Sequence, residues 1–275
     1  MDKELGIIVI HGMGETKEDY YWGLQEYISK ILGREIWSKV HLESIFYQDI
    51  MQTNEYRVWS DMVKKEVLDW KELRQFMLFG FADAATLEHK PDKEGSVYHK
   101  VQKKIVEALR KTRIKLGNKD KNIILVAQSL GGQVISNYIW DCKRNQGIFD
   151  KNNSDFYFIE PVEESFLKLE TLRYFFTTGC NIPLFVAGFD NIIAIERPND
   201  NFKWLNYFDR DDVLGWPLKP LSNSYYQVVD EDIEINTGNL VTKGWNPLSH
   251  TGYWTDRDFV KPLGEKIRSL LQLPE

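Results

Sequence analysis

The stretch Ile123-Ile-Leu-Val-Ala-Gln-Ser-Leu-Gly-Gly132 decides the fold of this chain. Its first half is a continuous apolar, largely β-branched run, which is typical of a strand buried on both faces of a parallel sheet. The run that follows, residues 133–140, has little polar face and predicts a helix buried against the same sheet. Ser129 therefore stands at a turn from a buried strand to a buried helix.

A serine at such a turn projects its hydroxyl above the carboxyl edge of the sheet. The residues two before and two after it must be small because the turn folds them together, and Ala127 and Gly131 meet that requirement. This pattern indicates a nucleophile elbow. Taken alone, however, Ser-x-Gly-Gly also fits an ordinary strand-to-helix turn, since serine and glycine are common at turns and helix caps.

The rest of the chain alternates between strand-like and helix-like segments. Strands are predicted at residues 5–11, 40–47, 172–177, 203–208 and 226–235, and helices at 21–31, ended by Gly33, at 97–109 and at 259–273. This order predicts an α/β fold, with a mostly parallel central sheet and helices on both faces, as one domain over residues 1–275. The segment at about 50–95 is longer than a crossover needs and predicts an inserted helix at about 55–81, a candidate cap.

Composition narrows the function classes. The chain has 35 basic and 41 acidic side chains and a formal net charge of −6, which as a whole does not attract a nucleic-acid backbone. The lysines and arginines of residues 100–121 mostly alternate with an apolar stripe, so we interpret them as a solvated helix face. No run reaches the roughly 20 apolar residues of a membrane helix, and no signal peptide is evident. We expect a cytoplasmic protein without an integral membrane segment.

Cys142 and Cys180 are the only cysteines, and neither sits in a metal-binding pattern. We therefore expect no metal and no cofactor. Cys180 is either a reactive thiol beside the site or, as we prefer, a small buried residue at a strand end.

A glycine-rich loop, His11-Gly-Met-Gly14, ends the first predicted strand. The carboxyl ends of parallel strands share one edge of a sheet, so we expect this loop to face Ser129. Backbone N–H groups of Met13 and Leu130 are then the candidate oxyanion hole. The other interpretation is a tight turn that leads into the next helix.

A serine hydroxyl needs an imidazole to take its proton and a carboxylate to orient that imidazole. Of the five histidines, His250 lies after the last predicted strand and before the last helix, where the base belongs in the order serine, acid, histidine. The acid is sought among Asp209, Asp211 and Asp212, which follow a predicted strand. We choose Asp212, because it precedes an apolar turn that would bury it, while Asp209 would stabilise the turn. Asp190 is a weaker candidate.

Four motifs together resemble the α/β-hydrolase superfamily, specifically lipase and esterase-like members that begin at the strand before the oxyanion loop. They are His11–Gly14, Ala127–Gly132, Asn206–Val213 and Ser249–Trp254, and they span nearly the whole chain. Thr177–Leu184 is similar to a further strand of the family, with Cys180 in place of a serine. The chain departs from the family pattern at Gln128, where many relatives have histidine, and at Ala127, which replaces a glycine.

The resemblance implies a serine hydrolase that cleaves carboxylic esters through an acyl-enzyme, with Ser129, His250 and Asp212 as the triad. We expect its partner to be a small-molecule or lipid ester and not a nucleic acid, and the oligomeric state stays open. Two alternatives remain: a protein of the same fold without catalysis that binds a partner or lipid, and an acyltransferase that uses the same site.

Overall fold

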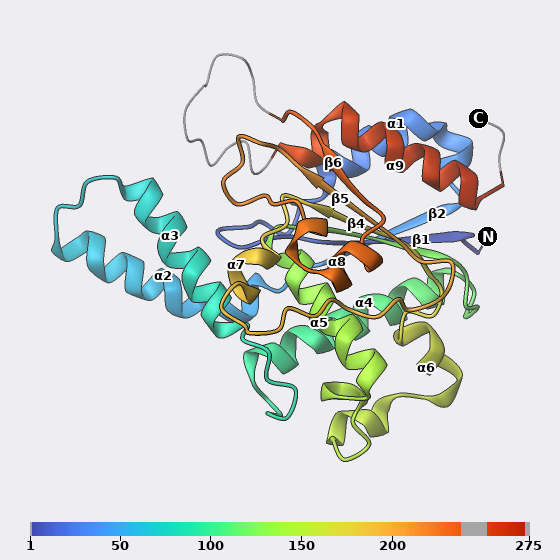
Figure 1. Cartoon of the computed structure of the whole chain (residues 1–275), viewed down its shortest axis with the longest axis horizontal. Helices are drawn as coiled ribbons and strands as arrows, with labels where there is room; N and C mark the ends of the chain where they lie inside the picture. The colour runs from blue at the N-terminus through green and yellow to red at the C-terminus, as the bar shows by residue number, and fades with distance from the viewer. Residues whose placement is uncertain (1, 238–251, 273–275) are drawn as a thin grey trace.

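The computed structural model describes residues 2–237 and 252–272, and a sheet of six parallel strands forms its centre (Figure 1). The strands are β1 (Leu5–Ile10), β2 (Val40–Ile45), β3 (Ile123–Gln128), β4 (Leu172–Thr178), β5 (Lys203–Phe208) and β6 (Glu231–Glu234). They lie in the order β2-β1-β3-β4-β5-β6, and each neighbouring pair is parallel. The predicted α/β fold with a mostly parallel sheet is confirmed.

Helices cover both faces of this sheet (Figure 1). The α-helices of the described residues are α1 (Trp22–Trp37), α2 (Gln48–Lys65), α3 (Lys71–Thr86), α4 (Val97–Lys115), α5 (Leu130–Arg144), α6 (Pro161–Leu167), α7 (Ile182–Val186), α8 (Asn223–Val228) and α9 (Arg257–Leu270). Helices α1 and α9 pack on one face, and α4, α5 and α8 pack on the other. The helix pair α2 and α3 extends to one side of the molecule (Figure 1).

The sequence of β1 explains why helices cover both faces of the sheet. Successive side chains of a strand point to opposite faces, and every residue of β1 is buried. Ile7 and Val9 belong to the core shared with α1 and α9, whereas Ile8 and Ile10 belong to the core on the α4 and α5 side. The continuous apolar run of the sequence thus serves two cores at once.

The predicted helix at about 55–81 is wrong as a single element. The chain leaves the helical conformation at Glu66, with φ −131° and ψ 149°, and α3 begins after Trp70, whose φ of 57° is left-handed. Apolar residues recur at helical spacing on both sides of this connection, so the periodicity by itself did not show the break. Val67 in the connection is 97% exposed, so no core contact opposes the turn.

Two other predicted boundaries also change. The first half of the predicted strand 226–235 is helical, because Ser222 caps α8 by accepting the Tyr225 N–H, and Tyr225 and Val228 are buried together on one side of that helix. Only Glu231–Glu234 pairs with β5. Gly33 does interrupt α1, at φ 77°, but helical structure resumes and continues to Trp37.

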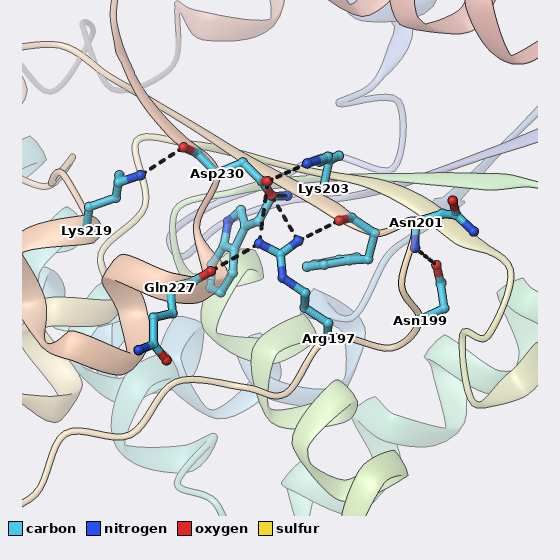
Figure 2. Close-up of polar contacts among 9 residues, drawn as sticks. Arg197, Asn199, Asn201, Lys203, Lys219, Gln227 and Asp230 are labelled. Atoms are coloured by element: carbon cyan, nitrogen blue, oxygen red, sulfur yellow. Dashed lines mark hydrogen bonds and ion pairs between the residues drawn. The ribbon is translucent and has the colours of Figure 1, made fainter.

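A cluster of ionic and polar contacts around Asp230, the residue before β6, connects it to the start of β5 and to Arg197 (Figure 2). Its carboxylate accepts hydrogen bonds from Lys203 at 2.9 Å and from the backbone N–H of Trp204 at 2.9 Å. Arg197 contacts both carboxylate oxygens, at 3.3 and 3.4 Å, and also donates to the carbonyl of Gln227. These contacts hold the amino-terminal end of β5, the strand that leads to Asp209 and Asp212.

The charged side chains of α4 agree with the interpretation of residues 100–121 as a solvated helix face. Lys103 pairs with Asp155 and Arg110 with Glu163, while the apolar stripe of α4 faces the core. In the described part of the chain, no helix is long and apolar enough to cross a membrane.

Candidate active site

Ser129 occupies the turn between β3 and α5, with a backbone conformation that residues other than glycine rarely adopt. Its φ is 53° and its ψ is −124°, outside the regions that non-glycine residues favour. Such strain persists only where the surroundings over-determine it, and it clusters at functional sites. The backbone N–H of Ser129 donates to the Thr178 carbonyl at 2.9 Å, so β4 holds the turn in place.

Close backbone contacts explain the small residues around this serine. A Cβ added to Gly131 would lie 2.5 Å from the His11 carbonyl oxygen and 3.0 Å from that of Ile10. A Cβ added to Gly12 would lie 2.6 Å from the Ser129 Cβ and 3.2 Å from its Oγ. The end of β1 therefore lies directly against the elbow, as the sequence predicted for the loop His11–Gly14.

His11 packs within this loop and does not serve Ser129. Its ring stacks on Tyr47 with centroids 4.1 Å apart, Nδ1 contacts the Gly12 carbonyl, and Nε2 accepts the Tyr47 N–H. Burial lowers the pKa of His11 to about 4, although the Gly12 carbonyl opposes that shift. This histidine is therefore neutral at pH 7, and its role is to shape the loop.

Two further contacts position the loop from α2 and α3. The N–H of Gly14 donates to Asp83 Oδ2 at 3.0 Å, and Gln48 donates to the Gly14 carbonyl at 2.8 Å. Within residues 2–237 and 252–272, no hydrogen bond involves the N–H of Met13 or of Leu130, the first residue of α5. Among the described residues, neither candidate oxyanion donor thus has a hydrogen-bond acceptor.

The structure separates the three candidate acids. Asp212 is buried, and its Oδ2 accepts a hydrogen bond from the Tyr253 hydroxyl at 2.8 Å. Asp209 accepts from the Asp211 N–H and from both the N–H and hydroxyl of Thr237, so it stabilises the turn. Asp211 is exposed.

Segment 252–255 lies against both the acid and the elbow. The Tyr253 hydroxyl that donates to Asp212 also accepts the Asp209 N–H at 2.9 Å. Trp254 Nε1 donates to the Thr178 hydroxyl at 3.1 Å, and Thr178 neighbours Gln128 in the sheet. Residues shortly after His250 in sequence are therefore placed at the strand ends.

His250 itself lies outside the described residues. The four described histidines have other partners: His11 as above, His41 beside Glu43, His89 beside Asp141, and His99 beside Asn153 and Asp155. None of these four forms a hydrogen bond with Ser129 in the described part of the chain.

Asn181 is a site residue that the sequence analysis missed. It is fully buried, and its Nδ2 lies 3.4 Å from Ser129 Oγ and 3.9 Å from the Met13 sulfur. The signal was a polar residue just beyond the end of a predicted strand, at the edge where the other site residues lie. Asn181 thus contacts both Met13 and Ser129, and this serine is only 1% exposed.

Cys180 is buried, and burial raises the pKa of its thiol to about 12, so it packs as a small apolar residue. Asp190 is exposed just beyond α7. Among the described residues, no three His, Cys, Asp or Glu side chains are grouped so that they could hold a metal ion.

Comparison with known proteins finds similarity at the level of structure. No protein-family model matches the sequence, and no curated protein matches it. A structure of metagenome-derived lipolytic enzymes is 10% identical, with 98% of this chain and 95% of that chain covered and a TM-score of 0.46. Dienelactone hydrolase from Anabaena variabilis is 10% identical, with 98% and 86% covered and a TM-score of 0.43.

A carboxylesterase from Bacillus cereus is also 10% identical, with 98% of this chain and 89% of that chain covered and a TM-score of 0.42. The names of these three structures are those of lipolytic enzymes, a dienelactone hydrolase and a carboxylesterase. At such identity the roles of individual residues come from the geometry around Ser129 itself.

Proposed function

We propose that this chain is a serine hydrolase that cleaves carboxylic esters through an acyl-enzyme on Ser129. The observation that carries the proposal is the backbone of Ser129, at φ 53° and ψ −124°, between a buried strand and the first turn of α5. That conformation lifts the hydroxyl above the strand ends and aims the free N–H groups of the helix toward it. An ordinary helix cap has its residue in the extended region instead.

In the proposed reaction, His250 takes the proton of the Ser129 hydroxyl while the oxygen attacks the ester carbonyl carbon. The carbonyl oxygen becomes an oxyanion and accepts hydrogen bonds from the N–H groups of Met13 and Leu130. His250 then gives its proton to the departing alcohol. Water, activated by the same histidine, attacks the acyl-enzyme, and the acid leaves as the proton returns to Ser129.

Asp212 would orient His250 and stabilise its charged form. Tyr253, three residues after His250, donates to this carboxylate. We take His250 as the base from its place in the sequence, after Ser129 and Asp212 in the order serine, acid, histidine.

We also propose that α2 and α3 form the cap of a single hydrolase domain. A Cβ added to Gly80 of α3 would lie 3.0 Å from the sulfur of Met13, so α3 packs on the loop beside Ser129. An apolar hollow of about 590 Å³ lies between the two helices and is lined in part by Trp59, Trp70 and Met77. A substrate would reach the buried serine when this cover moves.

A fluorophosphonate probe tests the proposal, because it forms a covalent bond only with an activated serine. We expect it to label the wild-type chain, and we expect Ser129→Ala to abolish both labelling and ester cleavage. His250→Ala should reduce both by at least ~10³-fold. Ser165→Ala, in α6, is the control and should behave like the wild type. Folded protein with no labelling would instead favour a binding role, and undiminished labelling of Ser129→Ala would reject the assignment.

A further inference from the structure

A cavity of about 710 Å³ lies along α5, on the side of the helix that faces α4 and residues 185–195. This volume is within the range of ~300–1,000 Å³ that ligand pockets occupy. Most of its wall is apolar or aromatic, including Val101, Trp140 and Phe185. We call it the α5 cavity.

The α5 cavity begins beside the nucleophile. Leu130, Val134, Asn137 and Trp140 line it, at the spacing that places residues on one side of a helix. Leu130 directly follows Ser129, and its N–H is a candidate oxyanion donor. The cavity therefore runs from the elbow along the length of α5.

Two amide side chains of the wall have buried polar atoms without a hydrogen-bond partner among the described residues. Gln102 is 1% exposed, yet neither Nε2 nor Oε1 of its side chain forms a hydrogen bond in the described part of the chain. Gln133 donates to Asn137 at 2.8 Å, but its own buried Oε1 likewise lacks a partner among those residues. Buried polar groups without a partner are rare and costly, and a bound molecule is one explanation for them.

Two other polar side chains of the wall are already engaged. Tyr98 and His89 both contact Asp141, at 2.6 and 2.9 Å. Arg144 stacks on the ring of Trp140, 3.4 Å from its centroid, so that aromatic face is occupied. Of the described residues that line the cavity, none is lysine or arginine. The wall thus offers no cationic side chain to a carboxylate or a phosphate. Glu88, the carboxylate among the described lining residues, already pairs with Lys90.

We propose that the α5 cavity binds an uncharged amphiphile, with an apolar body along α5 and one amide or hydroxyl group that Gln102 and Gln133 bind by hydrogen bonds. Gln102 supplies both a donor and an acceptor, and Gln133 supplies an acceptor. Because the cavity ends at Leu130, the occupant is the part of the ester substrate remote from the scissile bond. This last assignment rests on the proposed function, whereas the binding itself does not.

Three probes of similar length test the chemistry: N-hexylacetamide, which is neutral, hexanoate, which is an anion, and hexylammonium, which is a cation. Binding is measured by saturation-transfer NMR with the full-length Ser129→Ala chain, so that the amide probe is not cleaved. We expect N-hexylacetamide to bind at least ~10-fold more tightly than either ion. Equal binding of all three, or no binding because the cavity holds only water, would overturn the proposal.

Two variants locate the binding site. Gln102→Leu removes an unpartnered amide, so we expect its thermal stability to equal or exceed that of the parent while the affinity for N-hexylacetamide falls about tenfold. Ala85→Trp, at an exposed position on the wall, should block the probe by filling the cavity. Gln227→Leu, an exposed position outside the cavity, is the control and should leave binding unchanged. Unaltered affinity in the first two variants would reject the site.

Ester cleavage by proteins with Ser129 intact separates this inference from the proposed function. If Gln102→Leu raises KM for esters with a neutral amphiphilic tail but leaves short acetyl esters unchanged, the cavity is a substrate subsite. Amide binding through Gln102 without any ester cleavage would reject the proposed function and keep the binding site. Ester cleavage with unchanged KM and no amide binding would reject the site and leave the hydrolase proposal standing.

Discussion

The strained backbone of Ser129 costs free energy, and the same conformation places the Ser129 hydroxyl at the strand ends. Strain of this kind costs about 1–3 kcal/mol, and the glycines at 12 and 131 allow the neighbouring backbone to approach closely enough to hold the turn. A side chain at either position would overlap the elbow. The sequence pattern small-x-Ser-x-Gly is therefore a consequence of crowding at one strand end.

The three aspartates after β5 give the sharpest test at this scale. We expect Asp212→Asn to lower kcat by about 10⁴-fold, since an amide cannot stabilise the charged base. Asp209→Asn should leave kcat near the wild-type value but lower the melting temperature, because Asp209 holds Thr237 and the Asp211 N–H. Asp211→Asn, at an exposed position, is the control. Steady-state kinetics and thermal unfolding of the three variants measure both effects, and a larger kcat loss for Asp209→Asn would contradict our assignment.

Among the elements, α2 and α3 each contribute one carboxyl group to a buried pair beside the loop His11–Gly14. Asp83 of α3 accepts the Gly14 N–H, and Glu55 of α2 lies beside it, with both side chains almost wholly buried. Burial raises the pKa of both groups, and the pKa of Glu55 reaches about 8, while the charge on Asp83 adds to the shift. One proton shared by the pair relieves the repulsion between two carboxylates.

This pair predicts a pH dependence of stability. The folded chain keeps the Glu55 proton where the unfolded chain releases it, so the contribution is complete below the ordinary value of 4.5 and is lost as the pH rises to about 8. Glu55→Gln cannot ionise. We expect its melting temperature, relative to the wild type, to rise steadily between about pH 5 and pH 8 and then to level off.

Glu66→Gln, at an exposed position between the two helices, is the matched control and should show no such trend. A stability difference for Glu55→Gln that is the same at every pH would mean that the Glu55 proton is not taken up on folding.

For the molecule as a whole, the sheet order places four loops at one edge. Ile10 pairs with Ala127, Gln128 with Thr178, and Thr178 with Tyr207, so the residues after β1, β3, β4 and β5 emerge together. His11–Gly14, Ser129, Asn181 and Asp212 come from these four strand ends. The pairing of β5 and β6 thus affects where Asp212 lies.

Asp230 gives a test of that dependence. Although burial by itself would raise it, hydrogen bonds from Lys203, the Trp204 N–H and Arg197 hold the pKa of Asp230 below its ordinary value. The stability that this carboxylate contributes is therefore present above the unfolded pKa and is lost as the pH falls through the folded pKa. We expect Asp230→Asn to melt at a lower temperature than the wild type at pH 7, with a deficit that shrinks below about pH 4.

Asp200→Asn, an exposed position in the neighbouring loop, serves as the control in the same thermal unfolding series. A deficit for Asp230→Asn that persists unchanged in acid would show that the ion pairs of Figure 2 do not contribute to stability.

The sequence by itself determined the features that depend on neighbouring residues. The apolar runs at β1 and β3, the stripe of α4 and the small residues around Ser129 predicted the parallel sheet and the elbow, because burial on two faces and a crowded turn leave local patterns. The sequence also favoured Asp212 over Asp209, but it did not show the different contacts that these two residues make.

Only the tertiary structure decided what depends on segments distant in sequence. The contacts of Tyr253 with Asp212, of Asn181 with Ser129 and of Asp83 with Gly14 each join residues more than 40 positions apart. The division of the inserted segment into α2 and α3 likewise left no change in apolar spacing. Periodicity records which side of an element is buried, whereas the partner on that side is chosen by the packing of the whole chain.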